Sequence, residues 1–209
     1  MEGDEVRVNG VSGVLVKKLK TRATVMTDSG AVFVCKPSEL VLVCEHDEAT
    51  RKFHLGASHL LGSPARFSRA APLFRAAAEL GNPMAQYNLG CMYDNGDGVR
   101  KDAREAARYY ELAAAQSHCD AEYNLALKYL DGDGVAKDET RAAHLYERAA
   151  LSGIRNAQYN AGVMYEMGMG VEIDIPRAVK FFRMCAAQGD QNAVLKLARL
   201  DPTSVEAPL

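Results

Sequence analysis

The chain has 209 residues, of which 48% are hydrophobic and 25% charged, and its formal net charge at pH 7 is −2. This weak charge gives no general reason to expect nucleic acid or an anionic membrane as a partner. No window approaches ~18 uninterrupted apolar residues, so we expect no membrane-spanning helix. The start, MEGDEVRV, is acidic and lacks the apolar core of a secretory signal, which favours a cytoplasmic or nuclear protein over a secreted one.

The five cysteines are odd in number and irregular in spacing, which does not suit a framework of paired disulfides. Free thiols in a reducing compartment are therefore the simpler interpretation. The cysteines are Cys35, Cys44, Cys91, Cys119 and Cys185.

Residues 1–44 carry short valine-rich runs separated by turn residues, which predicts five β-strands. The expected turns include Asn9-Gly10, Ser12-Gly13 and Asp28-Ser29-Gly30. Five short strands with a one-turn break before the last, Leu40–Val43, resemble a small SH3-like barrel of the Tudor or KOW kind. Such a piece buries little core by itself, so we expect it to lean on the segment that follows.

A basic turn joins the second and third of these expected strands. Its residues are Lys17, Lys18, Lys20 and Arg22. KOW-like barrels use comparable loops on RNA or on proteins, so the resemblance leaves RNA contact open beside a simple solvated loop. Phe33 is the one aromatic residue in the first 44 positions, which argues against an aromatic cage for methyl-lysine and against a proline-binding groove.

After a polar link, Glu45–Thr50, the pattern becomes helical and repeats. The stretch AQYNLGCMYDNGDGV begins at Ala85 and returns as AEYNLALKYLDGDGV from Ala121 and as AQYNAGVMYEMGMGV from Ala157, a period of 36 residues. A fixed period of this length is typical of a stacked array of supersecondary units.

Each unit predicts a helix, a turn and a second helix. In the first helix Ala85, Leu89 and Tyr93 recur at i, i+4 and i+8, which places them on one face. The G-x-G turn ends that helix because glycine readily takes the left-handed conformation at C′. The second helix carries alanine pairs, which allow close helix contact, and one aromatic residue to fill the gap between layers.

Aspartates stand where the second helices need an N-cap, and Asp102 has Glu105 three residues later, the spacing of a capping box. Gly153 and Gly189 are expected to stop second helices, with Ser117 at the equivalent point. The expected cap residues are Asp102, Asp138 and Asp174.

The same register extends to both sides of the three full copies. Upstream, Leu55-Gly56 matches Leu89-Gly90 at an offset of 34, so a first unit with a shorter turn is expected. Downstream, Ala193–Leu200 predicts a lone helix that caps the array. We therefore expect a barrel over residues 1–44, a repeat domain over residues 51–200 and a flexible tail over residues 201–209.

The motif A-x-x-x-L-G-x-x-Y-x-x-G-x-G-V, followed by D and by A-A-x-x-Y-x-x-A-A-x-x-G, resembles the Sel1-like repeat. The resemblance covers about three quarters of the chain. It implies an α/α solenoid related to tetratricopeptide repeats, in a family whose members act mainly as adaptors in protein complexes. The expected fold is therefore mainly an α/α solenoid of helix pairs preceded by a small β-barrel.

By resemblance to tetratricopeptide repeats, the first helices line a concave groove. The expected lining is apolar and aromatic and suits a helix or an apolar segment of a partner. The alternative is that these side chains simply pack between units. The residues concerned are Tyr87, Cys91, Tyr123, Leu127, Tyr159 and Val163.

An asparagine recurs at one position of the first helix, as Asn88, Asn124 and Asn160. A row of amides along one face could bind the backbone of a partner peptide. The alternative is structural, because a buried amide needs a hydrogen-bond partner in a neighbouring helix or loop.

Other chemistry is weakly indicated. Cys44, His46, His54 and His59 invite a zinc interpretation, but their spacing matches no common structural zinc site. The G-x-G elements follow a helix rather than a strand and lack a Walker lysine, so they predict architecture rather than phosphate binding. We expect no metal, no cofactor and no small-molecule substrate.

The function expected from the sequence is that of a non-catalytic adaptor. The solenoid would bind a protein or peptide segment on its concave face, and the barrel would add a second contact surface or cap the array. The alternative is an RNA-associated factor that uses the basic turn, although six Lys/Arg and five Asp/Glu leave residues 1–44 close to neutral.

Overall fold

The computed structural model describes residues 48–60 and 67–201 with their side chains, and in the N-terminal part the backbone of five strands. The strands are β1 (Glu5–Val8), β2 (Val11–Lys18), β3 (Ala23–Thr27), β4 (Val32–Cys35) and β5 (Val41–Leu42). The helices are α1 (Glu48–Leu60), α2 (Phe67–Glu79), α3 (Pro83–Asn95), α4 (Ala103–Ala115), α5 (Cys119–Asp131), α6 (Glu139–Leu151), α7 (Arg155–Met167), α8 (Ile175–Ala187) and α9 (Gln191–Leu200).

The strands form one antiparallel sheet in the order β4-β3-β2-β1-β5. Ser12-Gly13 was expected to be a turn but lies inside β2, where Ser12 pairs with Arg7 and Gly13 with Val6. The ladder with β1 continues through these two residues because the pairing already begins at Val8 and Val11, next to them in the register. These pairings do not establish closure into an SH3-like barrel, which stays a prediction.

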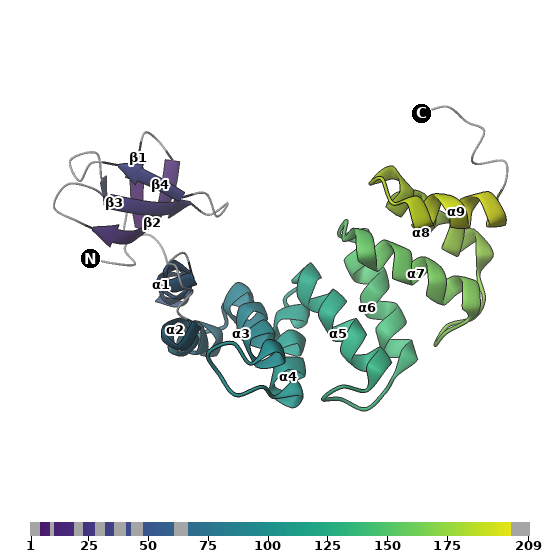
Figure 1. Ribbon diagram of the computed structural model, residues 1–209, viewed down its shortest axis with the longest axis horizontal. Helices are drawn as coiled ribbons and strands as arrows, with labels where there is room; N and C mark the ends of the chain where they lie inside the picture. Colours follow the sequence, from purple (N-terminus) through teal and green to yellow (C-terminus); the bar gives the residue numbers. More distant parts are fainter. Residues whose placement is uncertain are drawn as a thin grey trace. The chain divides into compact units, whose positions relative to one another are not determined.

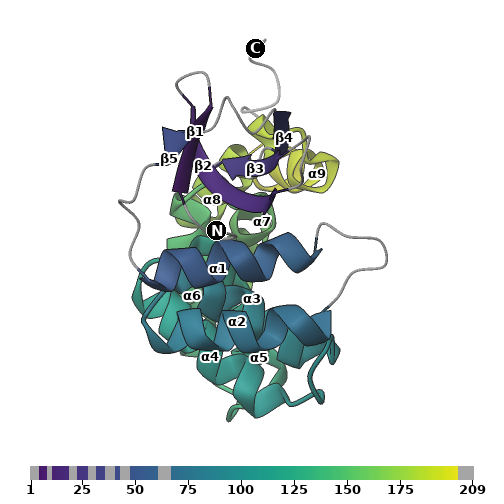
Figure 2. The same ribbon diagram turned by 90° about the vertical axis from the view of Figure 1, so that its left-hand side faces the viewer.

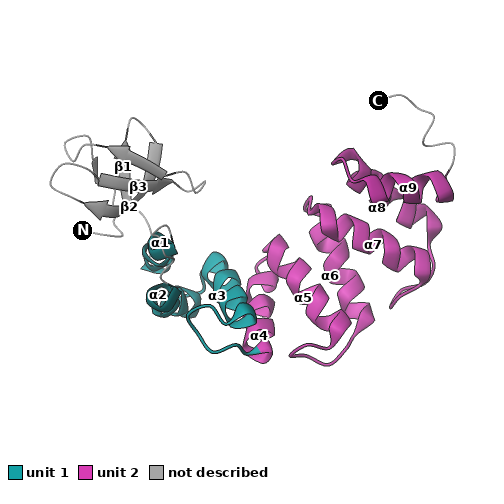
Figure 3. Ribbon diagram, in the orientation of Figure 1, with its two compact units in different colours: residues 1–102 teal, residues 103–209 magenta. Residues whose placement is uncertain are grey.

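The chain divides into two compact units, residues 1–102 and 103–209, coloured separately in Figure 3. The first unit contains α1, α2 and α3, and the second contains α4 to α9. Within the first unit, Figures 1 and 2 both show α1 and α2 side by side. Within the second, α5 pairs with α6 and α7 with α8, so the architecture is mainly that of α/α helix pairs.

The core of the helical part consists of the alanines and aromatic residues that the repeat predicts. Ala142, Ala149 and Ala150 of α6 are fully buried, as are the rings of Tyr146 and Phe182. Where the first helix has glycine, as at Gly162, the Phe182 ring occupies the space that a Cβ would need. The small residue therefore brings the aromatic ring of the second helix against the backbone of the first.

The two glycines of each turn do different work. Gly132 and Gly168 are left-handed C-caps, with φ of 70° in both, as the sequence predicts. Gly134 and Gly170 also have positive φ, and a Cβ there would overlap the backbone at the start of the preceding unit's second helix, α4 or α6. The second glycine thus fixes the contact between successive helix-pair repeats. This packing role accounts for its recurrence in each turn.

The second helices begin at their expected aspartates. The carboxylates of Asp138 and Asp174 accept hydrogen bonds from the backbone N–H of Arg141 and Arg177, each at 2.9 Å. The N–H of each aspartate donates to a tyrosine carbonyl of the preceding helix, Tyr129 and Tyr165 respectively. The cap N–H therefore needs no acidic side chain three residues later.

The same backbone contact is made at Asp102, where the sequence predicts a capping box. Its N–H donates to the Tyr93 carbonyl, while the Glu105 carboxylate pairs with Arg108 at 2.8 Å. The spacing was suggestive, but the helix-to-turn hydrogen bond common to all three turns takes the donor that a capping box would use.

Other boundaries differ from expectation by a few residues. Helix α1 begins at Glu48 rather than at Arg51, and Glu48 pairs with Lys52 one turn later. Gly153 and Gly189 end second helices with positive φ as expected, and Ser117 adopts the same left-handed conformation at φ 63°. The expected flexible tail lies outside the described residues from residue 202 onward.

Candidate functional site

The predicted groove residues share one property in the structure: each is half-buried. Within residues 103–209 we call the set on α5 and α7 the first-helix face. Within residues 1–102, α3 carries three equivalent residues. The first-helix face consists of Tyr123, Asn124, Leu127, Tyr159, Asn160 and Val163, and the residues of α3 are Tyr87, Asn88 and Cys91.

The two tyrosines of the first-helix face are partly structural. The Tyr123 ring lies 5.8 Å from the Tyr146 ring of α6, and the Tyr159 ring lies 5.6 Å from the Phe182 ring of α8. Each ring therefore packs against the second helix of its own repeat, and both tyrosines are half-buried. Leu127 and Val163 have no such ring contact among the described residues and stay half-exposed aliphatic positions.

The asparagine row has structural neighbours at two of its positions. Asn88 donates from its side chain to the Met84 carbonyl of its own helix at 2.7 Å. Asn160 faces the buried Tyr146 hydroxyl, whose pKa is raised mainly by burial and lowered less by this amide. The two groups do not meet hydrogen-bond geometry, so Asn160 is a neighbour of that hydroxyl rather than its bonded partner.

The row ends differently on α9. Lys196 stands one period after Asn160, where the aromatic of the preceding second helix is Phe182 in place of Tyr146. The Lys196 ammonium lies 5.8 Å from the centre of the Phe182 ring and binds the Glu166 carboxylate at 2.7 Å. An amide, Asn160, thus lies beside the tyrosine, and a cation, Lys196, lies beside the phenylalanine. This match between the polar side chain and the neighbouring ring supports a structural role for the position.

Most of the remaining candidates lie outside the residues whose side chains the structure describes. Lys17 and Lys18 end β2, and Lys20 and Arg22 lie outside the described residues, as do Cys44 and His46. His54 is buried with its ring 5.3 Å from Phe53, and His59 is half-buried. Across residues 48–60 and 67–201, no group of three or more His, Cys, Asp and Glu side chains could hold a metal ion.

The three cysteines that the structure describes are not joined in disulfides. Cys91 and Cys119 are half-buried, and Cys185 is buried with its pKa raised to about 11, chiefly by burial. Among the described helices none is long and apolar enough to cross a membrane.

Sequence reasoning missed a set of contacts that joins successive helices of the second unit. The Tyr129 hydroxyl of α5 donates to Glu111 of α4 at 2.8 Å and accepts from Arg141 of α6 at 3.1 Å. One period later, the Tyr165 hydroxyl donates to Glu147 at 2.9 Å, and Arg177 pairs with the same carboxylate. Burial raises the pKa of Tyr165 to about 12, so this hydroxyl remains a donor at neutral pH.

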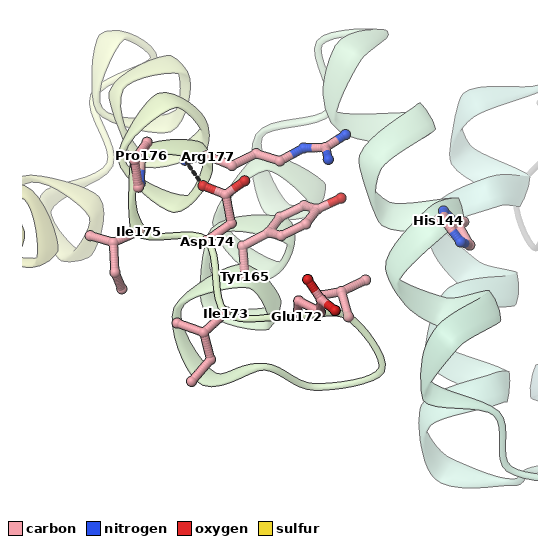
Figure 4. Close-up of a pocket in the computed structure, with 9 residues that line it drawn as sticks. His144, Tyr165, Glu172, Ile173, Asp174, Ile175, Pro176 and Arg177 are labelled. Carbon is pink, nitrogen blue, oxygen red and sulfur yellow. Dashed lines mark hydrogen bonds between the residues drawn. The ribbon is translucent and has the colours of Figure 1, made fainter.

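A second missed feature is a hollow beside the α7–α8 turn, with a volume of about 490 Å³. Figure 4 shows His144 of α6 across from the side of the turn that carries Tyr165 and Glu172. The lining residues are His144, Tyr165, Val171, Glu172, Ile173, Asp174, Ile175, Pro176 and Arg177. The signal available in the sequence was the departure of this turn, MGMGVEI, from its two counterparts, NGDGVRK and DGDGVAK.

Comparison with known proteins agrees with the helix pairs. The Sel1 repeat model matches residues 53–82, 83–118, 119–154 and 155–190, which is more than half of the chain. No curated protein sequence matches the chain. The first match starts within α1, and the later boundaries, at 83, 119 and 155, fall at the starts of α3, α5 and α7.

Several solved structures are similar to the chain, and two of them share about a third of its aligned residues. One is a protective antigen of uropathogenic Escherichia coli strains, with 32% identity and a TM-score of 0.69 over 73% of this chain and 33% of that one. The other is a Sel1 repeat protein from Oxalobacter formigenes, with 34% identity and a TM-score of 0.68 over 73% of this chain and 63% of that one. The chain thus spans about a third of the first protein and just under two thirds of the second. Sel1 repeats are typically protein-interaction modules, and this chain belongs to the Sel1 repeat family.

Proposed function

We propose that the chain is a non-catalytic adaptor whose first-helix face binds an apolar or amphipathic segment of a partner protein. The observation that carries this proposal is the shared half-exposure of Leu127 and Val163, one period apart on α5 and α7. A core position in this fold is covered completely, as Leu125 and Ala161 nearly or fully are. Aliphatic side chains left half-open at a repeating position gain free energy when a partner covers them.

The chemistry of the face suits a helix or an extended apolar segment. None of its six side chains is charged, and its asparagines offer both donors and acceptors. Aromatic and aliphatic side chains at the centre with amides beside them are the composition expected of an interaction surface. The family supplies independent support, because Sel1 repeats typically mediate contacts between proteins.

The test is capture of a partner from the native cell with the full chain and with two variants. Leu127→Glu combined with Val163→Glu places charge on the first-helix face. Leu112→Glu is the matched control, because Leu112 is an exposed leucine, 40% accessible, on the second helix α4. Tyr123→Ala is less suitable, since the Tyr146 contact makes that ring partly structural.

We expect a stoichiometric partner to be lost from the double variant and retained by Leu112→Glu, with far-UV circular dichroism unchanged in both. Equal retention of the partner by all three proteins would show that the first-helix face is not the binding surface.

Three further expectations stay predictions: a second contact surface on residues 1–44, a cytoplasmic location, and the alternative function of RNA contact. The RNA contact would use Lys17, Lys18, Lys20 and Arg22. RNA contact predicts binding that weakens steeply with salt and weakens again when the lysines are reversed to glutamate. Retention of RNA binding by residues 46–209 alone would exclude the basic turn as the contact.

A further inference from the structure

The α7–α8 turn has the same backbone as the α5–α6 turn but a different surface. Gly168 and Gly170 have φ of 70° and 68°, and their counterparts Gly132 and Gly134 have 70° and 79°. Ile173 lies over the first glycine of its turn, just as Lys137 lies over Gly132. The two turns therefore place their side chains alike, and what differs is chemistry.

Three polar positions of the earlier turn are apolar in the later one. Met167 stands for Asp131, Met169 for Asp133, and Ile173 for Lys137. Met167 and Ile173 are 62% and 66% exposed, among the most exposed large apolar side chains of the described residues. Apolar residues gathered at one exposed turn, where the equivalent turn carries charges, indicate an interaction surface rather than a need of the fold.

The hollow beside this turn is negatively charged. Glu172, where the earlier turns carry Arg100 and Ala136, is exposed and makes no ion pair or hydrogen bond with any residue that the structure describes. Asp174 caps α8, and the neighbouring cation, Arg177, is already paired with Glu147. The carboxylates thus exceed the available cations. The other ionisable side chains of the lining are the exposed imidazole of His144 and the Tyr165 hydroxyl.

We propose that this turn is a second docking surface, for a basic and apolar segment of another protein. Apolar side chains of that segment cover Met167 and Ile173, and a lysine or arginine enters the hollow beside Glu172 and Asp174. The unbranched methionines adapt to the shape of what covers them, and the excess carboxylates select a cation. The volume of about 490 Å³ lies within the ~300–1,000 Å³ of ligand-binding pockets.

The chain provides its own control for this proposal. A turn graft, Met167→Asp with Met169→Asp, Glu172→Ala and Ile173→Lys, gives the α7–α8 turn the sequence DGDGVAK of residues 131–137. Because that sequence already occupies the same backbone at the α5–α6 turn, the graft is expected to fold. Unchanged far-UV circular dichroism and urea unfolding check this directly.

Two synthetic peptides of fourteen residues (a design choice, about four helical turns) serve as probes, with leucines at identical positions and either lysine or glutamate at the others. Binding to the full chain is followed by fluorescence anisotropy and by the methyl resonances of Met167 and Met169. We expect the lysine peptide to bind and shift both methyl resonances, and the graft to weaken it on the order of tenfold. The glutamate peptide should bind the full chain no more tightly than the lysine peptide binds the graft.

Equal affinity of the lysine peptide for the full chain and the graft would overturn the proposal, as would equal binding of the glutamate peptide or absence of binding by both peptides. Self-association of the full chain that the graft abolishes would also overturn it, because the occupant would then be a second copy. The Leu127→Glu and Val163→Glu double variant should bind the lysine peptide normally, so this result is independent of the first-helix face.

Discussion

The α5–α6 and α7–α8 turns show how this chain separates structure from surface. Both end their first helix at a left-handed glycine, place a second glycine against the start of the preceding second helix, and begin the next helix at an aspartate. Yet one turn presents Asp131, Asp133 and Lys137, and the other presents apolar side chains at the same three positions. Residues that touch the neighbouring unit recur, whereas residues that face solvent diverge, so interaction chemistry is best sought at the positions that differ.

The largest expected effect breaks what the two turns share. Gly170→Ala forces a residue with a side chain into positive φ and drives its Cβ into the Glu139–Thr140 backbone. We expect a loss of about 3 kcal/mol of unfolding free energy, from left-handed strain and overpacking together. Urea unfolding followed by circular dichroism measures it.

The control is Gly153→Ala, which has a φ of 97° but no atom within 4 Å of the added Cβ. It should lose only the strain, about 1 kcal/mol. Equal losses at Gly170 and Gly153 would show that the contact between successive units contributes nothing.

A smaller effect concerns the residues that end α4 and α6. Ser117 adopts φ of 63°, where Gly153 stands one period later with φ of 97°. Ser117→Gly should therefore raise the unfolding free energy by about 1 kcal/mol, because serine is strained in this conformation and glycine is not. The reverse change, Gly153→Ser, should cost a similar amount; a gain from it would contradict the argument.

The smallest effect comes from one buried charge. Gln158 donates from its side chain to the Ala150 carbonyl at 3.1 Å. One period earlier, Glu122 stands in place of the glutamine, and Arg148 donates to the equivalent Ala114 carbonyl at 3.1 Å while pairing with Glu122 at 2.5 Å. Glu122→Gln restores the amide, and we expect an effect between neutral and a gain of about 1 kcal/mol at pH 7.

The stability effect of Glu122→Gln should depend on pH in a definite direction. Burial raises the pKa of Glu122 above its ordinary value of 4.5, against the opposing influence of Arg148. The folded chain therefore binds this proton more tightly than the unfolded chain, and ionisation above pH 4.5 costs stability. Any advantage of Glu122→Gln should shrink as pH falls toward 4.5 in urea unfolding, and an advantage that grows on acidification would contradict the assignment.

Sequence alone predicted the helix pairs, the turn glycines and the aspartate caps, because these depend on local backbone conformation that recurs every 36 residues. It did not predict what the second glycine touches, nor that Tyr129 and Tyr165 bridge helices, because those contacts join residues from different units. The Glu111/Glu147 and Arg141/Arg177 pairs did recur at the same period and could have indicated them. The barrel expected for residues 1–44 and the binding assignment of the groove rest on pattern and stay predictions.

The central claim is that the first-helix face binds a partner, and one measurement tests it most directly. The amount of partner retained from the native cell is compared between the full chain, the Leu127→Glu and Val163→Glu double variant, and Leu112→Glu. The account predicts loss of the partner from the double variant alone. Retention by the double variant at the level of the full chain would contradict the claim and leave the α7–α8 turn as the surface to pursue.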